Sequence, residues 1–146
     1  MLNSESISRT NLFFEEARLP LADRAQLDDY KGTGYDRGHM AAAWNMGTDE
    51  SKAQSFALAK MVSHNPENNQ NAWRKIEAHT RKYVMRAEDD VFVFTGPVFE
   101  SDHPTIGGNQ VWVPQHLFKL VYDPSTVVEI LRLDTYTRGM NSNNDG

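Results

Sequence analysis

Asp36, Arg37, Gly38 and His39 bring an acid, a guanidinium, a glycine and an imidazole into four consecutive positions. An imidazole has an ordinary pKa of about 6.5, so His39 can take and return a proton near neutral pH. The planar guanidinium of Arg37 suits phosphate oxygens, and Gly38 lets the backbone approach a ligand closely or adopt a conformation that other residues resist. The group predicts a phosphodiester site, although on these residues alone a surface turn with a satisfied histidine is the simpler interpretation.

A second group of residues recurs at steps of four: Asn69, Trp73 and Glu77. Each such step turns an α-helix by only about 40°, so the three side chains lie along one slowly drifting face. Trp73 also belongs to an apolar stripe, and we interpret it as a core residue. Asn69 and Glu77 can therefore serve one site.

Together the two groups closely resemble the DNA/RNA non-specific endonuclease family. This family is a branch of the ββα-metal (His-Me finger) nucleases and includes mitochondrial endonuclease G, and the chain resembles its endonuclease G-like members. The family signature is Asp-Arg-Gly-His, then an Asn four residues before a Trp and a Glu four residues after it; residues 36–39, Asn69, Trp73 and Glu77 match it. The resemblance covers roughly residues 9–123. It implies an α+β, ββα-metal fold with an antiparallel central sheet flanked by helices.

The resemblance also implies a division of chemical roles. His39 is expected to be the general base that takes a proton from the attacking water. Asn69 is expected to bind a single Mg²⁺, with Mn²⁺ as a substitute, because Mg²⁺ keeps several waters and needs few protein ligands. Glu77 is expected to orient those waters.

Two arginines and a lysine are the expected phosphate contacts. Arg37 and Arg9 hold the scissile phosphate in the family-based interpretation, and Asp36 fixes the strand and Arg37. Lys60 replaces an asparagine that family members usually carry. A lysine at that position either contacts phosphate directly or repels the metal and depresses the pKa of His39.

The predicted function is a Mg²⁺-dependent, sugar-non-specific endonuclease that hydrolyses phosphodiester bonds of DNA and RNA through their phosphate backbones. The alternative is a catalytically impaired nucleic-acid-binding homologue, which the replacement at Lys60 favours. A homodimer and an inhibitor protein are further partners that the resemblance allows, and no membrane partner is expected. The N-terminus resembles neither a signal nor a transit peptide, and the resemblance makes a secreted or periplasmic location plausible.

Composition limits these interpretations. The chain has 146 residues, 39% hydrophobic and 24% charged, which suits one globular domain over residues 1–146. Compared with the family that domain is short at its N-terminus, and residues 138–146 are expected to form a flexible tail. The absence of cysteine excludes disulfides and thiolate chemistry. A net charge of −5 argues against a broad basic coat but permits a local basic groove.

Hydrophobic periodicity predicts the elements that must position these residues. The motif itself is expected on a strand that follows a turn at residues 31–34, and Asn68 or Asn69 is expected to cap the helix that carries Asn69. Helices are predicted over 48–60, with a cap at Thr48 or Asp49 and packed behind the site, and over 69–88. Strands are predicted within 7–19, over 91–94 as a buried strand, over 110–113 and 117–122, and over 127–133 as an edge strand, with a loop over 100–110.

Five further polar residues have less specific signals. Asp28 and Asp29 are interpreted as solvated, because adjacent side chains rarely face one cation. His79 and His116 are interpreted as structural or surface residues. The role of His64 is left open.

Overall fold

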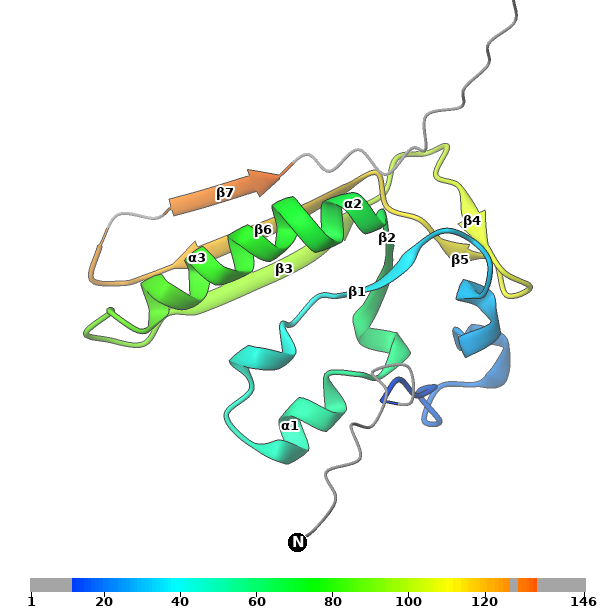
Figure 1. Ribbon diagram of the computed structural model, residues 1–146, viewed down its shortest axis with the longest axis horizontal. Helices are drawn as coiled ribbons and strands as arrows, with labels where there is room; N and C mark the ends of the chain where they lie inside the picture. Colours follow the sequence, from blue (N-terminus) through cyan, green and yellow to red (C-terminus); the bar gives the residue numbers. More distant parts are fainter. Residues whose placement is uncertain (1–11, 127–128, 134–146) are drawn as a thin grey trace, which may run out of the picture.

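The computed structural model describes residues 12–126 and 129–133 (Figure 1). Its α-helices are α1 (Asp49–Gln54), α2 (Pro66–Asn68) and α3 (Arg74–Val84), and a π-helical turn over Asn69–Trp73 joins the last two. Short 3₁₀ turns cover Leu21–Asp23, Leu27–Tyr30, Ala43–Asn45 and Leu58–Lys60. The strands are β1 (Asp36–His39), β2 (Met61–His64), β3 (Phe92–Val98), β4 (Thr105–Ile106), β5 (Val111–Trp112), β6 (His116–Tyr122) and β7 (Glu129–Leu133).

The strand that carries the Asp-Arg-Gly-His motif opens a ββα unit (Figure 1). Gly34 precedes it with a φ of 80°, a left-handed conformation that glycine adopts without strain. Strand β1 then pairs antiparallel with β2, which sets Asp36 opposite His64 and His39 opposite Met61. The chain passes from β2 directly into α2 and α3. The predicted motif strand and the helix that follows it are therefore confirmed.

The predicted cap and end of this helix are wrong. The cap is Asn65, whose side-chain oxygen accepts hydrogen bonds from the backbone N–H groups of Glu67 and Asn68. Pro66 occupies the first helical position, where its missing N–H costs nothing. The helix accordingly begins three residues earlier than position 69, and it ends at Val84 rather than at residue 88.

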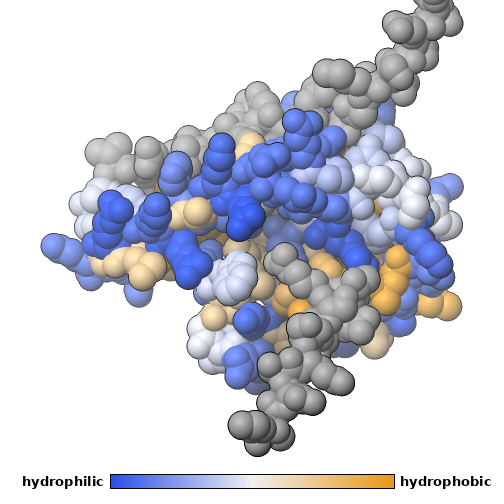
Figure 2. Space-filling view, in the orientation of Figure 1, coloured by the Kyte–Doolittle hydropathy of each residue, from blue (hydrophilic) through white to orange (hydrophobic). Residues whose placement is uncertain are grey.

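A three-stranded antiparallel sheet of order β3-β6-β7 lies behind α3 (Figure 1). On β6, Leu117, Lys119 and Val121 are buried and the residues between them are less so, as a strand with one covered face requires. Trp73, with 1% of its surface exposed, packs between Val62 and Leu117. Trp73 is thus the core residue that the sequence predicts, and the fold is the predicted antiparallel α+β fold. Figure 2 shows a largely hydrophilic surface over α3.

The prediction of a buried strand over residues 91–94 is wrong. Phe92 and Phe94 are 50% and 54% exposed. Strand β3 lies at an edge of its sheet and pairs only with β6 among the described strands. Phe92 and Phe94 stand opposite Tyr122 and Leu120 on the face turned away from the buried side chains of β6. An apolar run alone could not reveal that this face is uncovered by the described residues.

The helix predicted over residues 48–60 is shorter in the structure. Thr48 caps it as expected, accepting a hydrogen bond from the backbone N–H of Ser51, but α1 ends at Gln54. Just beyond the helix the backbone pairs with Phe14, whose N–H donates to the carbonyl of Phe56 and whose carbonyl accepts from Leu58 N–H. A strand is predicted within residues 7–19. In the described part of that range the structure shows only this isolated bridge at Phe14.

The interpretation of Asp29 as solvated is wrong. Its carboxylate is buried and accepts hydrogen bonds from the backbone of Gln26 and from the backbone and side chain of Asn109. Burial raises the pKa of Asp29, but these hydrogen bonds outweigh it and hold the pKa below its ordinary value. Asp29 thus anchors the predicted loop over residues 100–110. Strand β4 lies within this loop and pairs with β5, which directly follows it.

No helix among the described residues has the length and apolar character needed to cross a membrane.

Candidate active site

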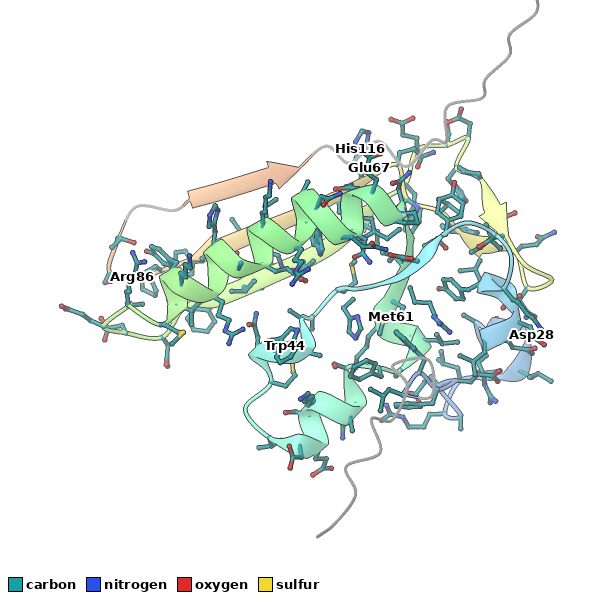
Figure 3. The ribbon with its side chains drawn as sticks, in the orientation of Figure 1. Asp28, Trp44, Met61, Glu67, Arg86 and His116 are labelled. Atoms are coloured by element: carbon teal, nitrogen blue, oxygen red, sulfur yellow. The ribbon has the colours of Figure 1, made fainter. Side chains whose placement is uncertain are left out.

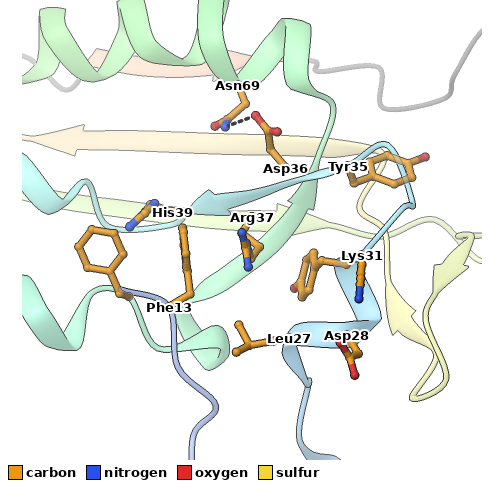
Figure 4. Close-up of a pocket in the computed structure, with 11 residues that line it drawn as sticks. Phe13, Leu27, Asp28, Lys31, Tyr35, Asp36, Arg37, His39 and Asn69 are labelled. Carbon is orange, nitrogen blue, oxygen red and sulfur yellow. Dashed lines mark hydrogen bonds between the residues drawn. The ribbon is translucent and has the colours of Figure 1, made fainter. Parts of the chain in front are cut away.

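Arg37 and His39 lie on the same face of β1, because alternate residues of a strand point to the same side. Both line a cavity of about 570 Å³, called here the first cavity (Figure 4). Asn69 and Asp36 also line it, together with Phe13, Leu27, Asp28, Tyr30, Lys31, Tyr35 and Phe56. The ββα unit therefore brings the strand residues and Asn69, which are thirty positions apart, to one hollow.

His39 is held in place by aromatic rings. Its ring meets Phe56 edge-on, with centroids 4.8 Å apart, and lies 5.7 Å from the ring of Phe13. The T-shaped contact with Phe56 and the tilted contact with Phe13 fix the orientation of the imidazole. The imidazole is thus oriented and half-buried at the edge of the first cavity.

The guanidinium of Arg37 lies 4.2 Å from the centroid of the Phe13 ring, a cation–π contact. Among residues 12–126 it forms no ion pair with a carboxylate. Its hydrogen-bond donors consequently face the first cavity without an acidic partner in that part of the chain. An anion such as a phosphate fits this arrangement.

Asp36 has a different role from the one expected. It does not pair with Arg37; its Oδ2 accepts hydrogen bonds from the side-chain amide of Asn69 at 2.9 Å and from that of Gln70 at 3.0 Å. An ionised carboxylate only accepts hydrogen bonds, so the nitrogen of the Asn69 amide must face Asp36. The Oδ1 atom of Asn69 is thereby directed away from Asp36.

The chemistry of these donors is compatible with a divalent cation that keeps most of its water ligands. Within the described residues no three His, Cys, Asp or Glu side chains gather to form a metal cage. Mg²⁺ retains several waters and needs only one or two protein oxygens. The Oδ1 atom of Asn69, oriented by Asp36, is a neutral oxygen of that type beside the first cavity.

Glu77 has a different environment from that of Asn69 and His39. Within the described chain it lines neither the first cavity nor the second one defined below. It is half-buried, and burial raises its pKa, while the nearby ammonium of Lys119 opposes that rise. Lys119 donates a hydrogen bond to Thr95 at 2.8 Å and lies 5.0 Å from the centroid of the Trp73 ring. Glu77 therefore contributes to a buried charged group around Lys119.

Lys60 lies in a second cavity, of about 590 Å³, and not in the first. The two cavities flank the end of β1, because His39 lines the first and Met40 the second. Arg81 and Lys119 also line the second cavity, and among its described lining residues none is acidic. The sequence indicated a local basic groove but not the contribution of Lys119. A lysine on an apolar strand was the signal that could have suggested it.

His64 is a site residue that sequence analysis left open. It is fully buried, and its ring lies edge-on to that of Trp73 at 5.9 Å. Burial lowers the pKa of His64 to about 4, although the charge of Asp36 and the polar side chain of Asn69 oppose the shift. A neutral imidazole therefore fills the space beneath β1, next to the residue expected to bind metal.

This packing explains Gly38 better than a close approach to ligand does. Its φ is not in the left-handed region, and a Cβ at Gly38 would lie 2.7 Å from both Cβ and Nδ1 of His64. We expect Gly38→Ala to lower the free energy of unfolding by about 1–3 kcal/mol through overpacking. Urea denaturation checks this, with Gly47→Ala as the matched control because a Cβ at Gly47 meets nothing within 4 Å. Equal stability of the Gly38→Ala variant would contradict the packing argument.

The pKa of His64 also predicts a pH dependence of stability. Between its ordinary pKa of about 6.5 and its folded pKa of about 4, the unfolded chain binds a proton that the folded chain excludes. The contribution of neutral His64 to the free energy of unfolding is fully present above pH 6.5. It is lost as the pH falls toward 4, by up to about 3 kcal/mol. Urea denaturation in chelator at pH 7.5 and pH 5 measures the loss. His64→Gln should show a smaller loss; an equal loss would exclude His64 as its source.

The remaining predicted residues lie elsewhere. His79 is exposed on α3, and His116 pairs with Glu100 at 3.2 Å; neither lines the first cavity. Arg9 and the expected tail over residues 138–146 lie outside the described residues.

A strand ending in Asp-Arg-Gly-His, an antiparallel partner and a following helix that presents Asn69 define a ββα-metal nuclease fold. The family model described as DNA/RNA non-specific endonuclease matches residues 2–144. The chain belongs to that family.

Named relatives and a solved structure agree with this assignment. Mitochondrial endonuclease G of Bos taurus is 37% identical over 120 residues, covering 75% of this chain and 40% of the relative. Mitochondrial nuclease EXOG of Xenopus laevis is 35% identical over 120 residues, covering 75% and 33%. A chain of the EndoG/EndoGI complex, solved to show the mechanism of EndoG inhibition, has a TM-score of 0.73 at 29% identity, covering 86% of this chain and 57% of that one. The chain thus spans about 40% or less of the length of these curated relatives.

Proposed function

We propose that the chain is a metal-dependent endonuclease that hydrolyses phosphodiester bonds of DNA and RNA. The observation that carries the proposal is the first cavity, where His39, Arg37 and Asn69 meet. The relatives named as nucleases support it. The mitochondrial names of these relatives differ from the expected secreted or periplasmic location, which stays a prediction.

In the proposed mechanism, His39 takes the proton from the attacking water, its ring held by Phe56. Arg37 binds non-bridging oxygens of the phosphate. Asn69 would hold Mg²⁺ through Oδ1, and the metal would supply charge neutralisation at the phosphate and at the leaving oxygen. Asp36 keeps the amide of Asn69 in the orientation that this requires.

Three other residues have proposed roles at a distance from the base. Lys60 contacts phosphate from the second cavity, which its position supports. Glu77 orients metal-bound water only if its carboxylate turns toward the first cavity, and Arg9 stays a predicted phosphate contact. The EndoG/EndoGI complex supports an inhibitor protein as a partner of this chain; a homodimer stays a prediction.

Conversion of supercoiled plasmid to nicked and linear forms tests the proposal, with a folded RNA as the second substrate. We expect cutting of both with Mg²⁺ or Mn²⁺ and none with chelator. The impaired binding homologue is the second candidate, favoured by the position of Glu77 beside Lys119 rather than in the first cavity. A folded chain that retards plasmid on a gel in Mg²⁺ but never cuts it would establish that candidate instead.

A further inference from the structure

Trp44 is a large aromatic residue that the proposed chemistry does not use. It lies on the 3₁₀ turn Ala43–Asn45 that follows β1, between α1 and α3 (Figure 3), and 69% of its surface is exposed. Burying an indole normally stabilises a fold, so an exposed one has no packing explanation here. Trp112 is also exposed, but its ring has two ring partners, His103 in a tilted contact at 4.2 Å and Phe99 edge-on at 5.3 Å. Trp44 has no ring partner among the described residues.

The surroundings of Trp44 are cationic. It lines the second cavity with Lys60, Arg81 and Lys119, where the described lining residues include no acid. The ammonium of Lys52 lies 5.4 Å from the centroid of its ring, which adds a further positive charge at the rim. An exposed indole among cations has the two components of a site for unpaired nucleic acid, a surface for base stacking and charges for the backbone.

The position of the second cavity connects it to the proposed reaction. Met40 lines it and directly follows His39, and the N–H of Met40 donates to the carbonyl of Lys60 at 3.1 Å. A strand of nucleic acid whose scissile phosphate lies at His39 would therefore continue past the end of β1 into this cavity. Its next phosphate would meet Lys60 and Arg81.

We propose that Trp44 stacks on a nucleobase of the bound strand and thereby makes single-stranded or locally unpaired nucleic acid the favoured substrate. The inference rests on the proposed function, because the path of the nucleic acid into the second cavity follows from placing its scissile phosphate at His39. Stacking on Trp44 requires a base whose faces are free, which a base inside a continuous duplex lacks. Phosphate contacts alone do not require a base with a free face.

Binding of fluorescein-labelled oligonucleotides in chelator tests the inference without turnover. Three probes of equal length suffice: a mixed-sequence single strand, its duplex, and an abasic single strand that keeps the phosphates and lacks bases. We expect Trp44→Leu to weaken binding of the normal single strand about tenfold, the scale of one lost stacking contact. Its affinities for the duplex and the abasic strand should stay within twofold. Trp44→Phe should recover part of the loss.

Trp112→Leu is the matched control, because Trp112 is an exposed tryptophan that lines neither cavity. Thermal unfolding confirms that each variant folds. Equal weakening of all three probes by Trp44→Leu, or no weakening of any, would overturn the inference. Plasmid cleavage by the unsubstituted chain is measured in parallel with the binding assay. If the chain cuts plasmid but Trp44→Leu does not selectively weaken binding of the normal single strand, only this inference is defeated. Base-dependent binding without cutting supports it and defeats the proposed activity.

Discussion

Replacing His39 by alanine is expected to lower the rate of plasmid cleavage about 10²- to 10⁴-fold, the usual contribution of a positioned general base. No other histidine of the described chain lines the first cavity. His64, the nearest alternative in sequence terms, is fully buried and holds a pKa of about 4, so it is a poor base for water at the surface. Single-turnover nicking in saturating Mg²⁺ measures the rate directly.

Two controls separate loss of the base from loss of structure. The ring of His39 packs against Phe56, so alanine also removes a contact; His39→Gln keeps a polar side chain of similar length and should be as inactive. His79→Ala removes an exposed histidine outside both cavities and should cut normally. A His39→Ala protein that cuts at the unsubstituted rate would refute the site assignment.

The sequence predicted the part of the site that depends on local spacing. A strand places Arg37 and His39 on one face, and the structure shows both at the first cavity. Pairing between distant segments was beyond such reasoning. Nothing local indicated that Asp36 would bind two helix side chains instead of Arg37, or that Gly38 leaves room for the ring of His64.

The fold shows the same division between local and distant determinants. Thr48 could be predicted as a cap because capping needs only the next three residues. The end of α1 could not, since backbone bonds to Phe14 replace helical ones. Lys60 was expected either to contact phosphate or to repel the metal, and the structure places it in a different cavity from Arg37. This position weakens the argument that a lysine at residue 60 repels the metal.

Replacing Asn69 by alanine is expected to reduce the cleavage rate at least about tenfold and to raise the Mg²⁺ concentration needed for half-maximal rate. Both effects follow because, among the described residues that line the first cavity, Asn69 offers the amide oxygen that Asp36 orients. Gln70→Ala is a matched control: Gln70 donates to the same oxygen of Asp36 but is exposed and lines neither cavity. It should change the Mg²⁺ requirement little. Equal Mg²⁺ curves for Asn69→Ala and the unsubstituted chain would remove Asn69 as the ligand, whereas a shift confined to Asn69→Ala would identify the Asp36–Asn69 pair as the metal-holding part of the ββα unit.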